Sequence, residues 1–151
     1  MSVEVVRVRN AAAFDMKAIA NLIRRSLASD SLVRNVNDAM DELQRFIDRD
    51  NLGLFIAREG RAWSGLLIAS WSRSALSPGC TILHLHNEGG RETLDALVEQ
   101  AIEYARDGGY DRVIGMDTND RPRGFKRLFG RKFKNVQLSG EVHVFELEDE
   151  T

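Results

Sequence analysis

The sequence has almost no cysteine: Cys80 is the only one among 151 residues. A single thiol cannot form an internal disulfide, and a zinc site built from a cysteine cluster is excluded. The lack of a disulfide framework fits a reducing compartment, so we expect a cytoplasmic protein. No partner for nucleophilic chemistry lies near Cys80 in the sequence, which favours a packed thiol over a reactive one.

Long hydrophobic runs and an excess of one charge are also missing. No segment approaches the ~20 consecutive apolar residues of a transmembrane helix, and the N-terminal residues do not place a charged stretch before an apolar one. We therefore expect neither membrane insertion nor export. The net charge of −2 does not draw the chain as a whole to nucleic acid or to a membrane surface, so neither is an expected partner.

The sequence does contain enough apolar material for one folded domain. Hydrophobic residues make up 43% of the chain and charged residues 29%, which supports a real core under a soluble surface. We expect a single domain over residues 1–147 and an acidic tail over residues 148–151. No internal repeat, linker or low-complexity segment interrupts that domain.

The apolar periodicity predicts strands and helices in the order βααβββαβαββ. An antiparallel meander followed by a strand–helix–strand crossover implies a mixed sheet. The predicted fold class is therefore α/β (α+β), with a mostly antiparallel sheet of about seven strands and helices on both faces. Asp15 is the expected N-cap of the first helix. The predicted strands cover residues 3–9, 52–57, 63–71, 82–86, 112–117, 136–138 and 142–147, and the helices residues 16–27, 40–47, 92–106 and 122–129.

The most informative segment spans residues 81–117, where a strand, two glycines, an amphipathic helix, two glycines and another strand follow one another. Gly89 and Gly90 separate the first strand from the helix, which opens near Arg91. Backbone N–H groups are unpaired at such a turn, and the helix dipole adds partial positive charge. The turn is a ready site for a phosphate or pyrophosphate group.

Further stretches occur in a recognisable order. VRVR at 6–9 precedes Asp15 and IANLI at 19–23, FIAREG at 55–60 precedes GLL at 65–67, and LVEQAIEYARDGGY occupies 97–110. In order and spacing, these stretches resemble the GNAT (N-acetyltransferase) superfamily over nearly the whole chain. The resemblance implies acetyl transfer from acetyl-CoA, as a co-substrate, to the amine of a small molecule or peptide by direct attack. It also makes a homodimer a candidate assembly.

The resemblance assigns cofactor-binding positions as well. The acetyl-pantetheine arm would run in the gap between the fourth and fifth strands, where a backbone N–H near Leu85 would polarise the thioester carbonyl. The pyrophosphate would sit on the loop at residues 87–93. The residues implied to bind the cofactor are Leu83, Leu85, Asn87, Gly89, Gly90, Arg91, Asn119 and Phe129.

Two regions depart from the family's pattern. In the pyrophosphate loop, Glu92 stands where a second small residue is usual and Asn87 where arginine or glutamine is usual, so the loop is degenerate. A carboxylate repels a pyrophosphate, and Arg91 could partly offset it. In the helix after the fifth strand, Phe129 matches a position that often carries a tyrosine, which protonates the leaving thiolate. The alternative function is therefore a GNAT-fold binding or structural protein that no longer uses acetyl-CoA.

His84 and His86 are the candidate catalytic residues. At i, i+2 on one strand they share a face, and the pKa of an imidazole suits a general base. The alternative is that both are half-buried strand residues hydrogen-bonded to neighbours. Two histidines without a third ligand do not indicate a metal site. Asp117 and Asn119, at the end of the fifth strand, either orient the amine or hold the pantetheine amide, or simply form the strand-end turn.

One basic segment stands out against the balanced charge, because residues 121–134 contain seven basic and no acidic side chains. It could hold the CoA phosphates, contact nucleic acid or form a solvated face. The phenylalanines between the charges fit the apolar face of a helix. A solvated face with some cofactor contact is therefore the favoured interpretation.

Overall fold

The computed structural model describes residues 2–115 apart from residues 31, 73 and 77. The predicted order of strands and helices is confirmed over these residues, and a short 3₁₀ helix, η1, is added to it. The predicted elements beyond residue 115 lie outside the described residues, so the domain over 1–147 and the tail over 148–151 stay predictions. The elements are β1 (Val3–Val8), η1 (Ala11–Asp15), α1 (Lys17–Ala28), α2 (Val36–Phe46), β2 (Leu52–Glu59), β3 (Ala62–Ser72), β4 (Gly79–Asn87), α3 (Arg91–Asp107) and β5 (Val113–Gly115).

The described strands form one five-stranded sheet in the order β1-β2-β3-β4-β5. The first three pairings are antiparallel, and β4 pairs with β5 in parallel. Helix α3 connects these last two strands, because a parallel pair needs a crossover connection. The predicted mixed, mostly antiparallel sheet is confirmed, and its two last predicted strands lie outside the described residues.

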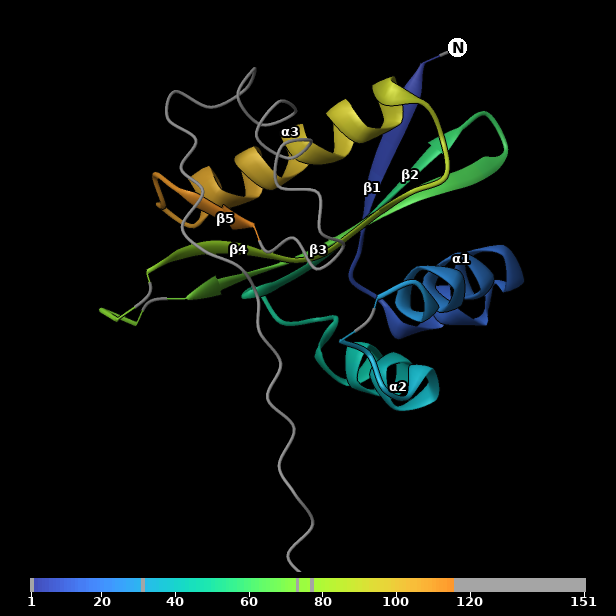
Figure 1. Ribbon diagram of the computed structural model, residues 1–151, viewed down its shortest axis with the longest axis horizontal. Helices are drawn as coiled ribbons and strands as arrows, with labels where there is room; N and C mark the ends of the chain where they lie inside the picture. Colours follow the sequence, from blue (N-terminus) through green and yellow to red (C-terminus); the bar gives the residue numbers. More distant parts are fainter. Residues whose placement is uncertain (1, 31, 73, 77, 116–151) are drawn as a thin grey trace, which may run out of the picture. The chain divides into compact units, whose positions relative to one another are not determined.

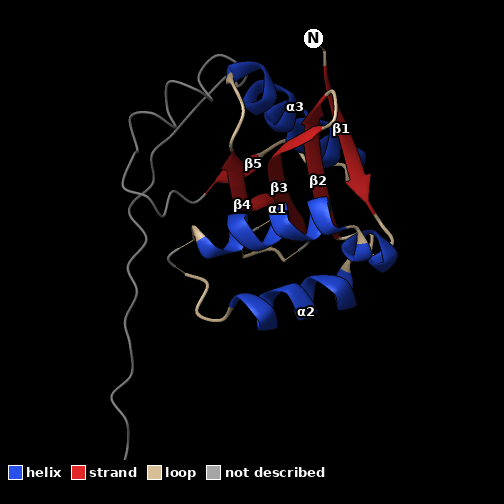
Figure 2. Cartoon of the chain, turned by 90° about the vertical axis from the view of Figure 1, so that its right-hand side faces the viewer, coloured by secondary structure: helices blue, strands red, loops and turns tan. Residues whose placement is uncertain are grey.

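Helices cover both faces of the sheet, as predicted. Figure 1 shows α3 on one side and α1 with α2 on the other, and the turned view in Figure 2 shows the same layering. Side chains alternate between faces along a strand. On β2, Leu54 and Ile56 pack in the core with α1 and α2, whereas the ring of Phe55 reaches Tyr104 of α3. The apolar run at 65–69 is buried throughout because β3 lies between both helical layers.

The start of α1 differs from the prediction. Met16, not Asp15, is the N-cap; it makes no side-chain capping hydrogen bond and is 53% exposed. Asp15 ends η1, and the side chain of Asn10 caps that helix by accepting a hydrogen bond from the backbone N–H of Ala12. The cap prediction was wrong because the chain completes a 3₁₀ turn before α1 begins. None of the described helices is long and apolar enough to cross a membrane.

An aromatic cluster ties the C-terminal half of α3 to the sheet. The ring of Tyr104 stacks on Trp71 of β3 at a centroid distance of 4.4 Å and meets Phe55 of β2 edge-on at 5.5 Å. The Tyr104 hydroxyl donates a hydrogen bond to the backbone carbonyl of Asp50 (2.7 Å), and the indole N–H of Trp71 donates one to the backbone carbonyl of Tyr104 (2.9 Å). The guanidinium of Arg7 lies 5.0 Å from the centre of the Tyr104 ring. Tyr104 therefore anchors α3 on the sheet.

Replacing Tyr104 tests this anchor. We expect Tyr104→Phe to lower the free energy of unfolding by about 1 kcal/mol, because one hydrogen bond to a partly buried carbonyl is lost. Tyr104→Ala should lower it by about 3–5 kcal/mol, because removal of the ring leaves a cavity. Urea denaturation followed by circular dichroism measures both values. Equal losses for the two variants would contradict an anchoring role for the ring.

Candidate functional site

Strand β4 runs through the candidate site, and its pairing is irregular at Leu83. Against β3, Ile82 pairs with Ala69 and His84 pairs with Ile68, so Leu83 is an extra residue without a partner. A β-bulge of this kind bends a strand and redirects its side chains. Leu83 is 44% exposed although it lies on an interior strand. The bulge therefore presents an apolar side chain at the surface of the sheet.

Strand β5 pairs with β4 just before the bulge. The parallel pairing joins residues 80–82 of β4 to residues 113–115, the last residues that the structure describes. Leu83 and Leu85, both predicted to bind the cofactor, lie on β4 at and just after the bulge.

His84 forms a buried pair with Asp30, which follows α1. The Nδ1 atom of His84 lies 2.9 Å from Oδ2 of Asp30. The two side chains are 9% and 10% exposed. The Nε2 atom of His84 is also buried, and it has no hydrogen-bond partner within the described part of the chain. A carboxylate–imidazole pair with one ring nitrogen unoccupied is an arrangement that suits a general base.

His86 belongs to a different and more exposed network. Its Nε2 atom lies 2.8 Å from Oε2 of Glu88, and its Nδ1 atom lies 3.4 Å from the hydroxyl oxygen of Ser29. The guanidinium of Arg25 donates two hydrogen bonds of 2.9 Å to the same carboxylate. The hydrogen bond from Arg25 is the main cause that lowers the pKa of Glu88 to about 2, and His86 adds to it. The network joins the end of α1 to the loop that precedes α3.

That loop is shaped by Asn87. Its side-chain oxygen accepts a hydrogen bond from the backbone N–H of Gly89 (2.9 Å), and its amide nitrogen donates one to the backbone carbonyl of Gly90 (3.1 Å). Gly90 is the N-cap of α3 and supplies no side-chain capping bond. A Cβ atom at Gly90 would meet nothing within 4 Å, and Arg91 and Glu92 are exposed in the first turn. The start of α3 is therefore open and suited to an anionic group.

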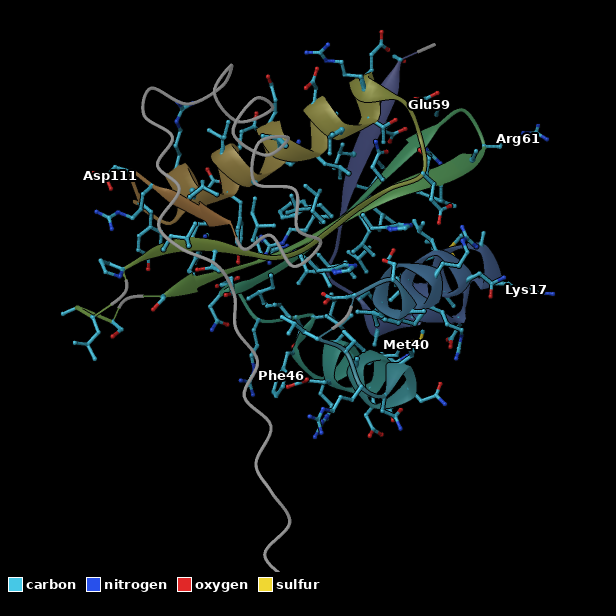
Figure 3. All side chains as sticks on the ribbon, viewed as in Figure 1. Lys17, Met40, Phe46, Glu59, Arg61 and Asp111 are labelled. Atoms are coloured by element: carbon cyan, nitrogen blue, oxygen red, sulfur yellow. The ribbon has the colours of Figure 1, made fainter. Side chains whose placement is uncertain are left out.

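Thr93 holds the underside of this helix start against the sheet. It is fully buried, and its hydroxyl donates a 2.8 Å hydrogen bond to Oε1 of Glu59. Figure 3 shows Glu59 beside the beginning of α3. A Cβ atom at Gly89 would lie 2.7 Å from the Thr93 hydroxyl oxygen and 3.1 Å from that of Ser64. Gly89 is therefore needed for the close packing of the loop on β3.

Comparison with known proteins gives matches among solved structures. No family model and no curated protein matches the sequence. AAC(6')-Iy, in complex with the bisubstrate analog CoA-S-monomethyl-acetylneamine, matches with a TM-score of 0.72 at 12% identity, over 98% of this chain and 99% of that one. A GNAT family acetyltransferase from Staphylococcus aureus matches with 0.66 at 14% identity, over 96% and 100%. An aminoglycoside acetyltransferase from an uncultured soil metagenomic sample, in complex with sisomicin, matches with 0.66 at 14% identity, over 97% of each chain.

The chain has the GNAT acetyltransferase fold. The resemblance that the sequence predicts is thereby confirmed at the level of fold, together with the fold class. At 12–14% identity the likeness shows the fold alone, so the activity and the site residues rest on this chain's own geometry. Within the GNAT fold, β4 carries the bulge and both histidines.

Several predicted positions lie outside the described residues or have other roles. Asp117, Asn119, Phe129 and the basic segment at 121–134 lie outside the described residues, so their assignments stay predictions. Cys80 is fully buried, and burial raises the pKa of its thiol to about 11, as expected of a packed thiol rather than a nucleophile. Within residues 2–115, no group of three His, Cys, Asp or Glu side chains is placed to hold a metal ion.

Sequence reasoning missed the partners of both histidines. Asp30 lies 54 positions from His84, in a polar stretch whose only signal is an acidic residue after an amphipathic helix. Glu88 lies two positions from His86, and this short spacing was the one local signal that could have indicated a pair. Arg25 lies 63 positions from Glu88 and has no such signal. The fold brings these groups together because α1 ends over β4.

The ionisation of Glu88 tests the network. We expect a carboxyl ¹³C titration to give a pKa of about 2 for Glu88 in the wild type. Arg25→Gln should raise this pKa towards the ordinary value of 4.5, because the largest stabilising contact of the carboxylate is removed. Arg24→Gln on the same helix is the matched control, since Arg24 bonds Asn37 instead. A wild-type value near 4.5 would contradict the network.

The lowered pKa of Glu88 also predicts how the free energy of unfolding depends on pH. Because the folded-state pKa of Glu88 lies below its unfolded value, its contribution is complete above about pH 4.5 and is lost as the pH falls through about 2. The difference in unfolding free energy between the wild type and Arg25→Gln should therefore shrink as the pH is lowered over this window. Urea denaturation at several pH values measures it, and a difference independent of pH would contradict the linkage.

Proposed function

We propose that this protein is an N-acyltransferase that transfers an acetyl group from acetyl-CoA to the amine of a small molecule or peptide. One observation carries the proposal: a single strand, β4, leads from a bulge past an imidazole–carboxylate pair, with side chains 9% and 10% exposed, into an open helix N-terminus. Acyl transfer from a long phosphorylated thioester needs these features together. They supply groups for an extended arm, a base for the amine and a positive helix end for phosphates.

The open start of α3 is the proposed pyrophosphate site. Gly90 and Arg91 begin the helix without a side-chain cap, and Asn87 holds the preceding turn in place. Gly89 keeps this turn close to β3. Glu88, the first acidic residue of the loop, is bound to Arg25 and so does not oppose a phosphate as a free charge. Leu83 and Leu85 would lie along the pantetheine arm.

His84 is the proposed general base. Both ring nitrogens of His86 have partners, whereas Nε2 of His84 has none among the described residues. In the reaction, the amine nitrogen forms a bond to the thioester carbonyl carbon, and Nε2 takes the proton that the nitrogen loses. The carbon–sulfur bond then breaks and CoA leaves as a thiolate, which takes a proton from water. A backbone N–H group of β4 near Leu85 would stabilise the negative carbonyl oxygen.

One observation favours a second candidate, a GNAT-fold binding or structural protein that no longer uses acetyl-CoA. Glu92 is exposed in the first turn of α3, where a carboxylate interacts well with the helix dipole but opposes a bound pyrophosphate. Its charge therefore competes with the phosphates for the same helix end. Whether the protein binds acetyl-CoA distinguishes the two functions. For either function we propose a cytoplasmic location, supported by the single buried thiol of Cys80.

Calorimetric titration with acetyl-CoA, with free CoA for comparison, tests the proposed function. We expect binding, and a rise in folded stability of about 2.7 kcal/mol at ~100 times the dissociation constant. Glu92→Gln should tighten binding about fivefold, because a like charge near the phosphates is removed, equivalent to ~1 kcal/mol. Glu103→Gln, an equal change of charge on an exposed residue later in α3, should leave the affinity unchanged. No binding at millimolar acetyl-CoA would refute the acyltransferase and favour the second candidate.

The two histidines should differ in their effect on turnover. We expect His84→Gln to lower kcat about 100-fold or more, because a general base contributes on the order of 10²–10⁴. His86→Gln should lower it less than about tenfold, because this imidazole holds the loop through Glu88. Initial rates with a panel of primary amines that includes sisomicin and an N-terminal alanine peptide measure both. A larger loss for His86→Gln would reverse the assignment.

A further inference from the structure

Both oxygens of the Asp30 carboxylate have fixed partners. Oδ2 lies 2.9 Å from Nδ1 of His84, and Oδ1 accepts a 2.9 Å hydrogen bond from the backbone N–H of Leu32. The backbone of Asp30 is held as well, because its N–H donates to the carbonyl of Leu27 (3.2 Å) and its carbonyl accepts from the N–H of Val33 (3.1 Å). The carboxylate therefore has a defined position before any substrate arrives.

This geometry decides the tautomer of His84. An ionised carboxylate only accepts hydrogen bonds, so Nδ1 of His84 must carry the proton that bonds Asp30. In a neutral imidazole the other nitrogen, Nε2, then carries the lone pair. Because Nε2 is buried without a partner in the described residues, its lone pair is not committed to another group.

The pair of His84 with Asp30 also differs from the neighbouring pair of His86 with Glu88, and the difference indicates a functional role for His84 and a structural one for His86. His86 and Glu88 are 19% and 32% exposed in their side chains, and both ring nitrogens of His86 have partners. An imidazole that only supports the fold gains nothing from a buried nitrogen without a hydrogen bond, which is destabilising. An unpaired Nε2 is useful where a substrate proton is to be taken.

We infer that Asp30 is a positioning residue that holds His84 in the Nδ1–H tautomer, with Nε2 directed as the acceptor of the amine proton. This inference rests on the proposed acyltransferase function. Asp30 touches no reacting atom; it acts through the imidazole, which it orients and whose developing positive charge it stabilises during proton transfer. The loop after α1 thereby becomes part of the site although it is distant from β4 in the sequence.

Nitrogen-15 NMR of the imidazole rings in the full chain tests the tautomer without any substrate. The sequence has three histidines, so His86→Gln and His143→Gln identify the signals of His84. We expect the neutral form of wild-type His84 to carry its proton on Nδ1, and Asp30→Asn to lose this single tautomer. A neutral wild-type ring with its proton on Nε2 would overturn the inference.

Kinetics test the role of the pair. We expect Asp30→Asn to lower kcat by about tenfold to 100-fold, with the KM for acetyl-CoA unchanged within about twofold. The double variant Asp30→Asn/His84→Gln should be no slower than His84→Gln alone, because the two residues act as one unit. Asp41→Asn, the same change on an exposed residue of α2, is the matched control and should leave kcat unchanged. Wild-type kcat in Asp30→Asn, or multiplicative losses in the double variant, would overturn the inference.

The outcomes separate this inference from the proposed function. If the wild type does not bind acetyl-CoA, the proposed function fails and the positioning role of Asp30 in catalysis fails with it. If the wild type acetylates an amine and His84→Gln is slow but Asp30→Asn is not, only the role of Asp30 is refuted. If Asp30→Asn does not fold, the tautomer of His84 in the wild type still decides, because that measurement needs no change at Asp30.

Discussion

The register of β4 against β3 is the constraint on which the candidate site depends. Leu83 is an extra residue between two strand pairs, Ile82 with Ala69 and His84 with Ile68. These two pairs lie on opposite faces of the sheet. A bulge moved by one residue would turn His84 away from the layer formed by α1 and α2, because side chains alternate along a strand. One local irregularity therefore sets the direction of the imidazoles.

Helix α1 links the two halves of the site. Its last turns supply Arg25 to the loop before α3, and the chain just after it supplies Asp30 to His84. The loop that would hold phosphates and the imidazole that would take a proton are thus positioned by one element. Packing of α1 in the core, with Leu22 and Ile23 fully buried, fixes the distance between them. A shift of α1 would alter both, so loosening this core would weaken binding and proton transfer together.

The sequence predicts what depends on neighbouring residues, and little of what depends on distant ones. The apolar stripe of α3 and the alternation around His84 and His86 are local patterns, and the structure has both elements. The β-bulge at Leu83 depends on how two strands pair, and no local pattern marks it. The pair of His84 with Asp30 joins residues 54 positions apart, and only the folded chain brings them together. Local sequence patterns thus predicted His84 and His86 as site residues but not the carboxylates that orient them.

Whether the N-terminus of α3 can hold a pyrophosphate depends on the charge of one side chain, Glu92. Two carboxylates, Glu88 and Glu92, lie within the segment that would hold the pyrophosphate. Glu88 is compensated by a bidentate contact with Arg25, and the hydrogen bond from Arg25 is the main cause of its low pKa. It is thereby tied to the α1 side of the sheet, while Glu92 remains exposed in the first turn with Arg91 as its neighbour in the chain. The helix dipole attracts a bound anion, and the exposed carboxylate of Glu92 repels it. These two interaction energies differ by only about 1 kcal/mol. The degenerate loop is therefore compatible with a cofactor site of reduced affinity.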